Sequence, residues 1–72
     1  MKKTRYNYIY LVDFLRKNKI SQTDLAKILC ISRMAVYNKL NNKSNFNYDE
    51  AITFKRNFNL TQEQVERFFF FK

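Results

Sequence analysis

Two short amphipathic segments within residues 21–40 constrain the fold of this chain more than any other feature of its sequence. Three apolar side chains of the first segment recur at helical spacing and so share one face: Leu25, Ile28 and Leu29. Ala26 adjoins this face, where a small side chain lets a second helix approach closely. Ser21 can cap the segment, and Asp24 three positions later completes a capping-box variant, so we expect a helix from about Gln22.

The second segment follows a break in the apolar pattern at residues 30–31. Ser32 is its expected N-cap, and Val36 and Leu40 lie on one side of the helix that follows. Four larger side chains are left for the other faces: Arg33, Met34, Tyr37 and Asn38. No acidic residue occurs from Leu25 through Tyr48. The pattern therefore predicts a helix-turn-helix over residues 21–40 whose second helix faces a polyanion.

The net charge of +8 lies wholly in the part of the chain that holds this motif. Residues 1–48 contain ten Lys or Arg and two acidic residues, whereas residues 49–72 contain four of each kind. A basic surface attracts nucleic acids and anionic membranes alike. Because the charge coincides with the motif, we expect double-stranded DNA as the partner and no contact with a membrane.

The chain has no glycine and no proline, so other residues must mark the ends of its helices. Asparagine tolerates the left-handed conformation and caps helices, and it recurs at six expected boundaries: Asn18, Asn41, Asn42, Asn45, Asn47 and Asn59. A first helix is predicted from about Tyr8 to Lys17, with four residues on its inner face: Tyr8, Leu11, Val12 and Leu15. Tyr6, Tyr8 and Tyr10 alternate as in a strand, but a lone strand would have nothing to pair with.

Two further helices are expected after the motif. Asn47 and Glu50 form another capping-box variant, which places a helix start at Tyr48, and Asn59 ends that helix. Thr61 caps the last helix, whose inward residues are Val65, Phe68 and Phe69. The sequence thus predicts an all-α fold, a compact five-helix bundle that forms a single domain over residues 1–72.

The last helix ends in four consecutive phenylalanines, Phe68 to Phe71. Successive side chains on a helix point about 100° apart, so all four cannot face the core. We expect Phe70 or Phe71 to face outward and to form a protein interface.

Several classes of function are disfavoured by composition. There is no histidine and no glycine-rich loop, and the single cysteine, Cys30, is expected to pack rather than to react. The adjacent carboxylates Asp49 and Glu50 belong to a helix start, where negative charge is favourable. We therefore expect no enzyme, no metal or other cofactor and no small-molecule substrate. No apolar run has the length of a signal peptide or membrane span, so we expect a soluble protein, and the single cysteine favours a reducing cytoplasm.

The motif resembles that of the Cro and repressor-type (XRE) helix-turn-helix regulators of temperate phages, and the likeness covers roughly residues 8–69. It rests on these residues: Gln22, Leu25, Ala26, Leu29, Ile31, Ser32, Arg33, Val36 and the run Lys39-Leu40-Asn41-Asn42-Lys43-Ser44. The resemblance implies the five-helix fold of lambda-repressor-like and Cro proteins. The chain departs from it at Cys30, where the family usually has glycine, and at Lys39, where many members have an apolar residue.

The resemblance also implies a set of DNA contacts. Three residues match positions that reach base edges: Arg33, Met34 and Asn38. Five match positions near phosphates: Gln22, Ser32, Asn41, Asn42 and Lys43. Side-chain chemistry agrees, since arginine can bind guanine in a fork, asparagine can pair with adenine, and methionine can contact a thymine methyl group. Apart from the resemblance, residues 1–6 can form a flexible basic arm whose charges, Lys2, Lys3 and Arg5, either follow the DNA backbone or make no contact.

Two functions stay open at this point. The chain can be a Cro-like transcription regulator of a phage genetic switch that binds operator DNA, for example as a homodimer. Alternatively, it can be an antirepressor, a modulator of repression (MOR-type) that forms a heterocomplex with the phage repressor. The acid-free stretch around Arg33 favours DNA, whereas the aromatic segment Tyr6 to Tyr10 and the Phe-rich end favour a protein partner.

Overall fold

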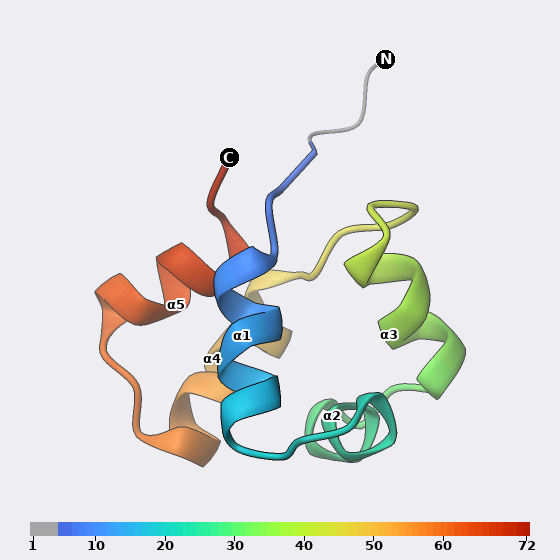
Figure 1. Ribbon diagram of the computed structural model, residues 1–72, viewed down its shortest axis with the longest axis horizontal. Helices are drawn as coiled ribbons and strands as arrows, with labels where there is room; N and C mark the ends of the chain where they lie inside the picture. The colour runs from blue at the N-terminus through green and yellow to red at the C-terminus, as the bar shows by residue number, and fades with distance from the viewer. Residues whose placement is uncertain (1–4) are drawn as a thin grey trace.

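Helices make up most of residues 5–72, which are the residues that the computed structural model describes (Figure 1). In chain order they are α1 (Ile9–Lys17), α2 (Gln22–Leu29), α3 (Arg33–Leu40), α4 (Tyr48–Phe58) and α5 (Gln62–Phe69). This part of the chain contains no strand. The prediction of an all-α chain with five helices is therefore confirmed, and every predicted start lies within one residue of the observed one.

Side-chain caps set the first residues of α2 to α5. The hydroxyl of Ser21 accepts a hydrogen bond from the Asp24 amide, and the Asp24 carboxylate accepts one from the Ser21 amide, at 3.0 and 3.1 Å. These bonds hold the pKa of Asp24 below its usual value. Reciprocal capping boxes also open α4, between Asn47 and Glu50, and α5, between Thr61 and Gln64. A single Ser32 cap opens α3.

A residue with left-handed backbone conformation follows the last residue of each of α1 to α4 by one or two positions, although the chain has no glycine. These residues are Lys19, Cys30, Asn42 and Asn59, with φ between 53° and 61°. After each one, the next amide donates to the carbonyl five positions back, as in a Schellman motif; the four bonds are Ile20 to Leu15, Ile31 to Ala26, Lys43 to Asn38 and Leu60 to Lys55. Cys30, which stands where the resembled family usually has glycine, thus has a left-handed backbone.

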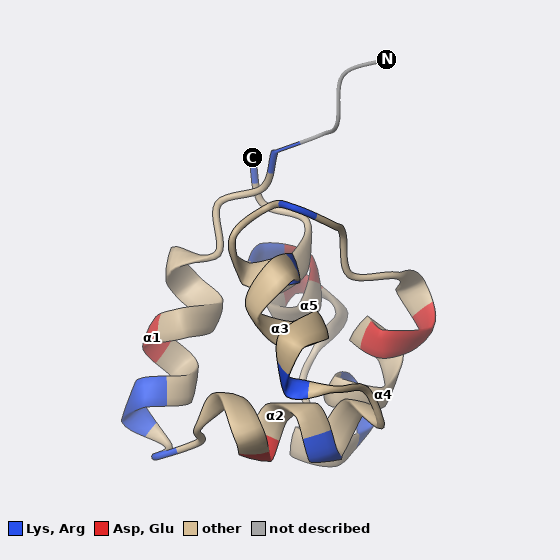
Figure 2. Ribbon diagram, turned by 90° about the vertical axis from the view of Figure 1, so that its right-hand side faces the viewer, with Lys and Arg blue, Asp and Glu red and all other residues tan. Residues whose placement is uncertain are grey.

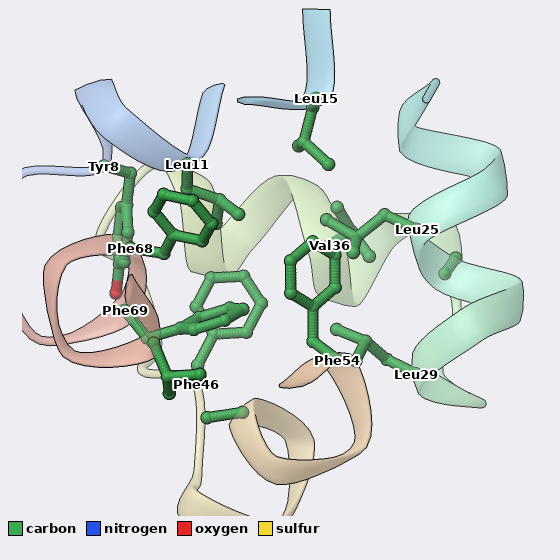
Figure 3. Packing of buried hydrophobic residues seen from close by; sticks show 13 residues of the cluster. Tyr8, Leu11, Leu15, Leu25, Leu29, Val36, Phe46, Phe54, Phe68 and Phe69 are labelled. Atoms are coloured by element: carbon green, nitrogen blue, oxygen red, sulfur yellow. The ribbon is translucent and has the colours of Figure 1, made fainter. Parts of the chain in front are cut away.

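All five helices contribute to one core, and aromatic rings fill its centre (Figure 3). Phe54 of α4 and Phe69 of α5 are fully buried, with ring centroids 5.3 Å apart. The inward residues predicted for α5 are all buried: Val65, Phe68 and Phe69. The backbone of α1 lies close to α5, that of α4 close to both α2 and α5, and that of α3 close to α2 alone among the described helices.

One prediction for α1 is wrong. Val12 was placed on the inner face, but 37% of it is exposed, whereas Leu11 and Leu15 are buried. The helix is rotated toward Phe14, whose ring packs against Phe54, Phe58 and Phe68 at centroid distances of 5.0–5.8 Å. The larger aromatic ring buries more apolar surface than valine does, so it determines which side of α1 faces the core.

Within residues 5–72, no helix combines the length and the apolar character that crossing a membrane requires.

Candidate nucleic-acid interface

Helix α3 lies at one edge of the molecule (Figure 1), and three of its eight residues are exposed. Val36 is its one buried residue, and it inserts into the core beside α2 (Figure 3). In Figure 2, α3 faces the viewer and stands above α2. Arg33 is exposed there, and 66% of Met34 is exposed. Two of the residues predicted to contact bases therefore reach solvent from the first turn of α3.

A shallow hollow of about 400 Å³ lies between the start of α2 and the outer side of α3. Its lining residues are Gln22, Arg33, Met34 and Tyr37. The hollow thus brings two predicted base contacts together with Gln22, a predicted phosphate contact from another helix. The Arg33 guanidinium makes no ion pair with any of residues 5–72, so it keeps its donors for a ligand.

Ser32 is the N-cap of α3 and directly precedes Arg33, which lines the hollow. Its hydroxyl oxygen accepts a hydrogen bond from the Ala35 amide at 3.0 Å, and the residue is exposed. Because a serine hydroxyl also carries a hydrogen, it can donate to an anion while it caps the helix. The capping role and the predicted phosphate contact are therefore compatible.

A second group of predicted residues lies at the other end of α3. Tyr37 is exposed, and the Lys43 ammonium nitrogen lies 5.8 Å from the centre of its ring, within the range of a cation–π contact. The side-chain amide of Asn41 donates a hydrogen bond to the Tyr37 carbonyl at 2.8 Å. This places Asn41 and Lys43 beside Tyr37.

Two predicted DNA contacts lie away from the hollow. Asn38 is half-buried and does not line it. Asn42 uses its side-chain amide to bind the backbone of Tyr6, with bonds of 2.8 and 3.0 Å. Tyr6 belongs to the predicted flexible arm, so this end of the arm is held in place. The rest of the arm, before Arg5, lies outside the described residues.

The basic residue Lys39 faces inward, whereas the other basic residues of the acid-free stretch are exposed: Lys27, Arg33 and Lys43. Its ammonium nitrogen lies 3.2 Å from the Glu50 carboxylate and donates to the Asn45 carbonyl at 2.9 Å. Its charge is thus neutralised within the fold and contributes little to an anion-binding surface. Leu40 is half-buried against the core, as expected from its packing role.

A separate apolar surface lies on α1, which we call the α1 patch: Ile9, Tyr10, Val12 and Phe71. All four residues are among the exposed large hydrophobics, and the rings of Tyr10 and Phe71 contact at 5.2 Å between centroids. Beside the patch, a hollow of about 500 Å³ extends along α1 to Asp13 and Arg16. Sequence reasoning missed this surface because it turned Val12 inward; the i, i+3 spacing of Ile9 and Val12 was the available signal.

The two terminal phenylalanines differ in exposure. Phe71 is exposed, as expected for one of the pair. Phe70 is half-buried and packs edge-on against the Tyr6 ring at 5.9 Å. An interface at this end of the chain would therefore use Phe71.

Comparison with models of known protein families and with curated proteins finds no match for this sequence.

Proposed function

We propose that this chain is a helix-turn-helix regulator, of the Cro and repressor type, that binds operator DNA of a phage genetic switch through α3. The observation that carries the proposal is the hollow formed by Gln22, Arg33, Met34 and Tyr37 on the exposed side of a peripheral helix. A helix at the edge of a molecule can enter the major groove of DNA, and α2 is the one close helix neighbour of α3 among residues 5–72.

The residues around the hollow suit a base edge rather than a small polar substrate. An arginine fork matches the two acceptors of guanine, and the apolar surfaces of Met34 and Tyr37 suit a thymine methyl group. Gln22 approaches from the start of α2, where an amide can donate to a backbone phosphate. The basic excess in residues 1–48 supports the same choice, since phosphate charge dominates DNA affinity.

Selection of duplexes from a random pool by the full chain tests the proposal. We expect enrichment of a defined sequence, and a fluorescence anisotropy titration that favours it over random duplex by about a thousandfold or more. Arg33→Ala should remove most of this preference. Arg56→Ala on α4 is the matched control, because it removes the same charge from an exposed position on another helix. Failure to enrich any sequence would exclude the proposal.

The α1 patch favours a second candidate, the antirepressor that binds the phage repressor. Exposed apolar groups that cluster on one side of a small domain are typical of protein interfaces. Co-purification of the chain with the repressor of the same phage tests this function. Ile9→Ser should abolish the complex, and Arg33→Ala should leave it intact; the reverse result would place the repressor on α3.

A further inference from the structure

Two asparagines occupy equivalent places at the ends of two helices, but only one of them binds another segment. Asn42 after α3 and Asn59 after α4 both have left-handed backbones, with φ of 61° and 53°, and both are followed by the closing bond described above. The Asn42 side chain accepts a hydrogen bond from the Tyr6 amide at 2.8 Å and donates one to the Tyr6 carbonyl at 3.0 Å. Asn59 makes no side-chain hydrogen bond within residues 5–72.

The segment that Asn42 binds is itself fixed to the opposite end of the chain. The Asn7 amide donates to the Phe71 carbonyl at 2.7 Å, and the Tyr6 ring packs on Phe70. Figure 1 shows the start of the described chain, in blue, and the C-terminal end, in red, at the same side of the molecule. The N-terminal segment, residues 5–8, therefore connects the C-terminal end with the loop that follows α3.

Helix α3 depends on such a connection because α2 is its one close helix neighbour in the described part of the chain. In its last turn, Lys39 forms an ion pair with Glu50 and a hydrogen bond to the Asn45 carbonyl. Just after the helix, Asn42 forms hydrogen bonds with Tyr6. Lys43 follows Asn42 directly, and its ammonium group lies over the Tyr37 ring. The position of Asn42 thus fixes where the last turn of α3 and Lys43 stand.

We propose that Asn42 is a positioning residue for DNA binding, which fixes the end of α3 by binding the N-terminal segment instead of contacting a phosphate. This inference rests on the proposed function. Its physical basis is that the Asn42 amide oxygen and one of its N–H groups already bond to the Tyr6 backbone, which fixes the orientation of the side chain within the fold. A recognition helix held in one orientation avoids the free-energy cost of becoming ordered when it binds.

Asn42→Gly tests the inference because glycine keeps the left-handed backbone and removes the side-chain bonds. Asn59→Gly is the matched control, with the same change at an equivalent helix end. We expect Asn42→Gly to bind the selected duplex about tenfold more weakly, as loss of one to two hydrogen bonds predicts, and Asn59→Gly to bind like the wild type.

The salt dependence of binding separates positioning from a phosphate contact of Asn42 itself. Because asparagine is neutral, losing such a contact would leave the slope of log K against log salt unchanged, whereas loss of the position of Lys43 should lower the slope by up to about one. Linkage gives a second measurement, because DNA must then slow hydrogen exchange of the Tyr6 amide in the wild type and not in Asn42→Gly.

Three results would overturn the inference. Equal DNA affinities of wild type and Asn42→Gly would reject it and leave the proposed function intact. An affinity loss at unchanged melting temperature, with Tyr6 exchange insensitive to DNA, would reject the role of the N-terminal segment. A wild-type chain that selects no duplex would reject the proposed function first, and the inference with it.

Discussion

Lys39 at the end of α3 and Glu50 in the first turn of α4 form an ion pair that is nearly buried, with Nζ 3.2 Å from Oε1 and side-chain exposures of 13% and 10%. The same carboxylate oxygen accepts a hydrogen bond from the Asn47 backbone amide in the capping box of α4. One carboxylate therefore caps one helix and anchors another. Among the salt bridges within residues 5–72, the pair between Lys17 and Asp13 is much more exposed, although its distance is 3.0 Å.

We expect Lys39→Ala to destabilise the fold by about 3 kcal/mol, because it leaves the Glu50 carboxylate nearly buried without its cation. Lys17→Ala is the control and should change stability by less than about 1 kcal/mol. Urea unfolding of both variants measures the difference. Equal effects of the two substitutions would show that Glu50 is solvated in spite of its position. Lys39→Met with Glu50→Gln should recover part of the loss, since it removes both charges together.

Cys30→Gly should stabilise the chain by about 1 kcal/mol. The backbone of Cys30 is left-handed, with φ of 59°, and a side chain costs on the order of 1 kcal/mol in that region whereas glycine adopts it freely. Thermal melting under reducing conditions measures the gain, and Cys30→Ala is the control because it removes the thiol and keeps the strained backbone. A gain of equal size in Cys30→Ala would assign the effect to the exposed thiol instead.

Tyr8→Phe should leave stability equal or slightly higher at neutral pH. The Tyr8 hydroxyl is buried without a hydrogen-bond partner among the described residues, while its ring packs edge-on against Phe46 at 5.4 Å. Phenylalanine keeps the ring contact and removes the unpaired polar group. A loss of more than about 1 kcal/mol in urea unfolding would mean that the hydroxyl binds a solvent molecule that stabilises the fold.

The same residue predicts a response to alkaline pH. Burial, with a smaller effect from Tyr6, raises the pKa of the Tyr8 phenol from 10.0 to about 12. The folded state therefore favours the neutral phenol, and the stability linked to Tyr8 is present below pH 10 and is lost as the pH rises from about 10 to 12. The stability of Tyr8→Phe should decline less than that of the wild type over this range. Parallel pH profiles would show that the phenol ionises as freely in the folded chain as in the unfolded one.

The parts of this fold that follow from local sequence rules were predictable. Starts of helices depend on residues three positions apart, so Ser21 with Asp24 and Asn47 with Glu50 could be identified from the sequence alone. The rotation of α1 could not, because it depends on how Phe14 meets rings from α4 and α5 that are distant in the sequence.

The candidate site shows the same division. Arg33 and Met34 were expected on the open side of α3, since that follows from helical spacing around Val36. The hydrogen bonds between Asn42 and Tyr6 could not be expected from the sequence, because the two residues are 36 positions apart and no local pattern indicates that they meet. The inward position of Lys39 likewise depends on Glu50, which lies on another helix.

Arg33 and Lys43 should affect DNA binding in different ways. If Arg33 reads a base, Arg33→Ala loses about 1–3 kcal/mol on the selected duplex and relaxes preference at one base pair. Lys43→Ala should weaken binding to all sequences about equally and lower the salt slope by about one. Anisotropy titrations with selected and random duplexes at several salt concentrations measure both effects. Identical losses on the two duplexes for Arg33→Ala would exclude its role in base recognition.

Substitution by serine should have different effects at Phe70 and Phe71: a loss of folding stability at Phe70 and a loss of association at Phe71. Phe70 is half-buried against Tyr6, so Phe70→Ser should cost about 1.5 kcal/mol of folding stability. Phe71 is exposed in the α1 patch, so Phe71→Ser should leave the unfolding midpoint nearly unchanged and weaken any complex formed through the patch about tenfold or more. Sedimentation of the chain alone and with the phage repressor measures association. Loss confined to the mixture would favour the antirepressor function, loss in the chain alone would identify the patch as a homodimer contact, and unchanged mass in both would exclude it as an interface.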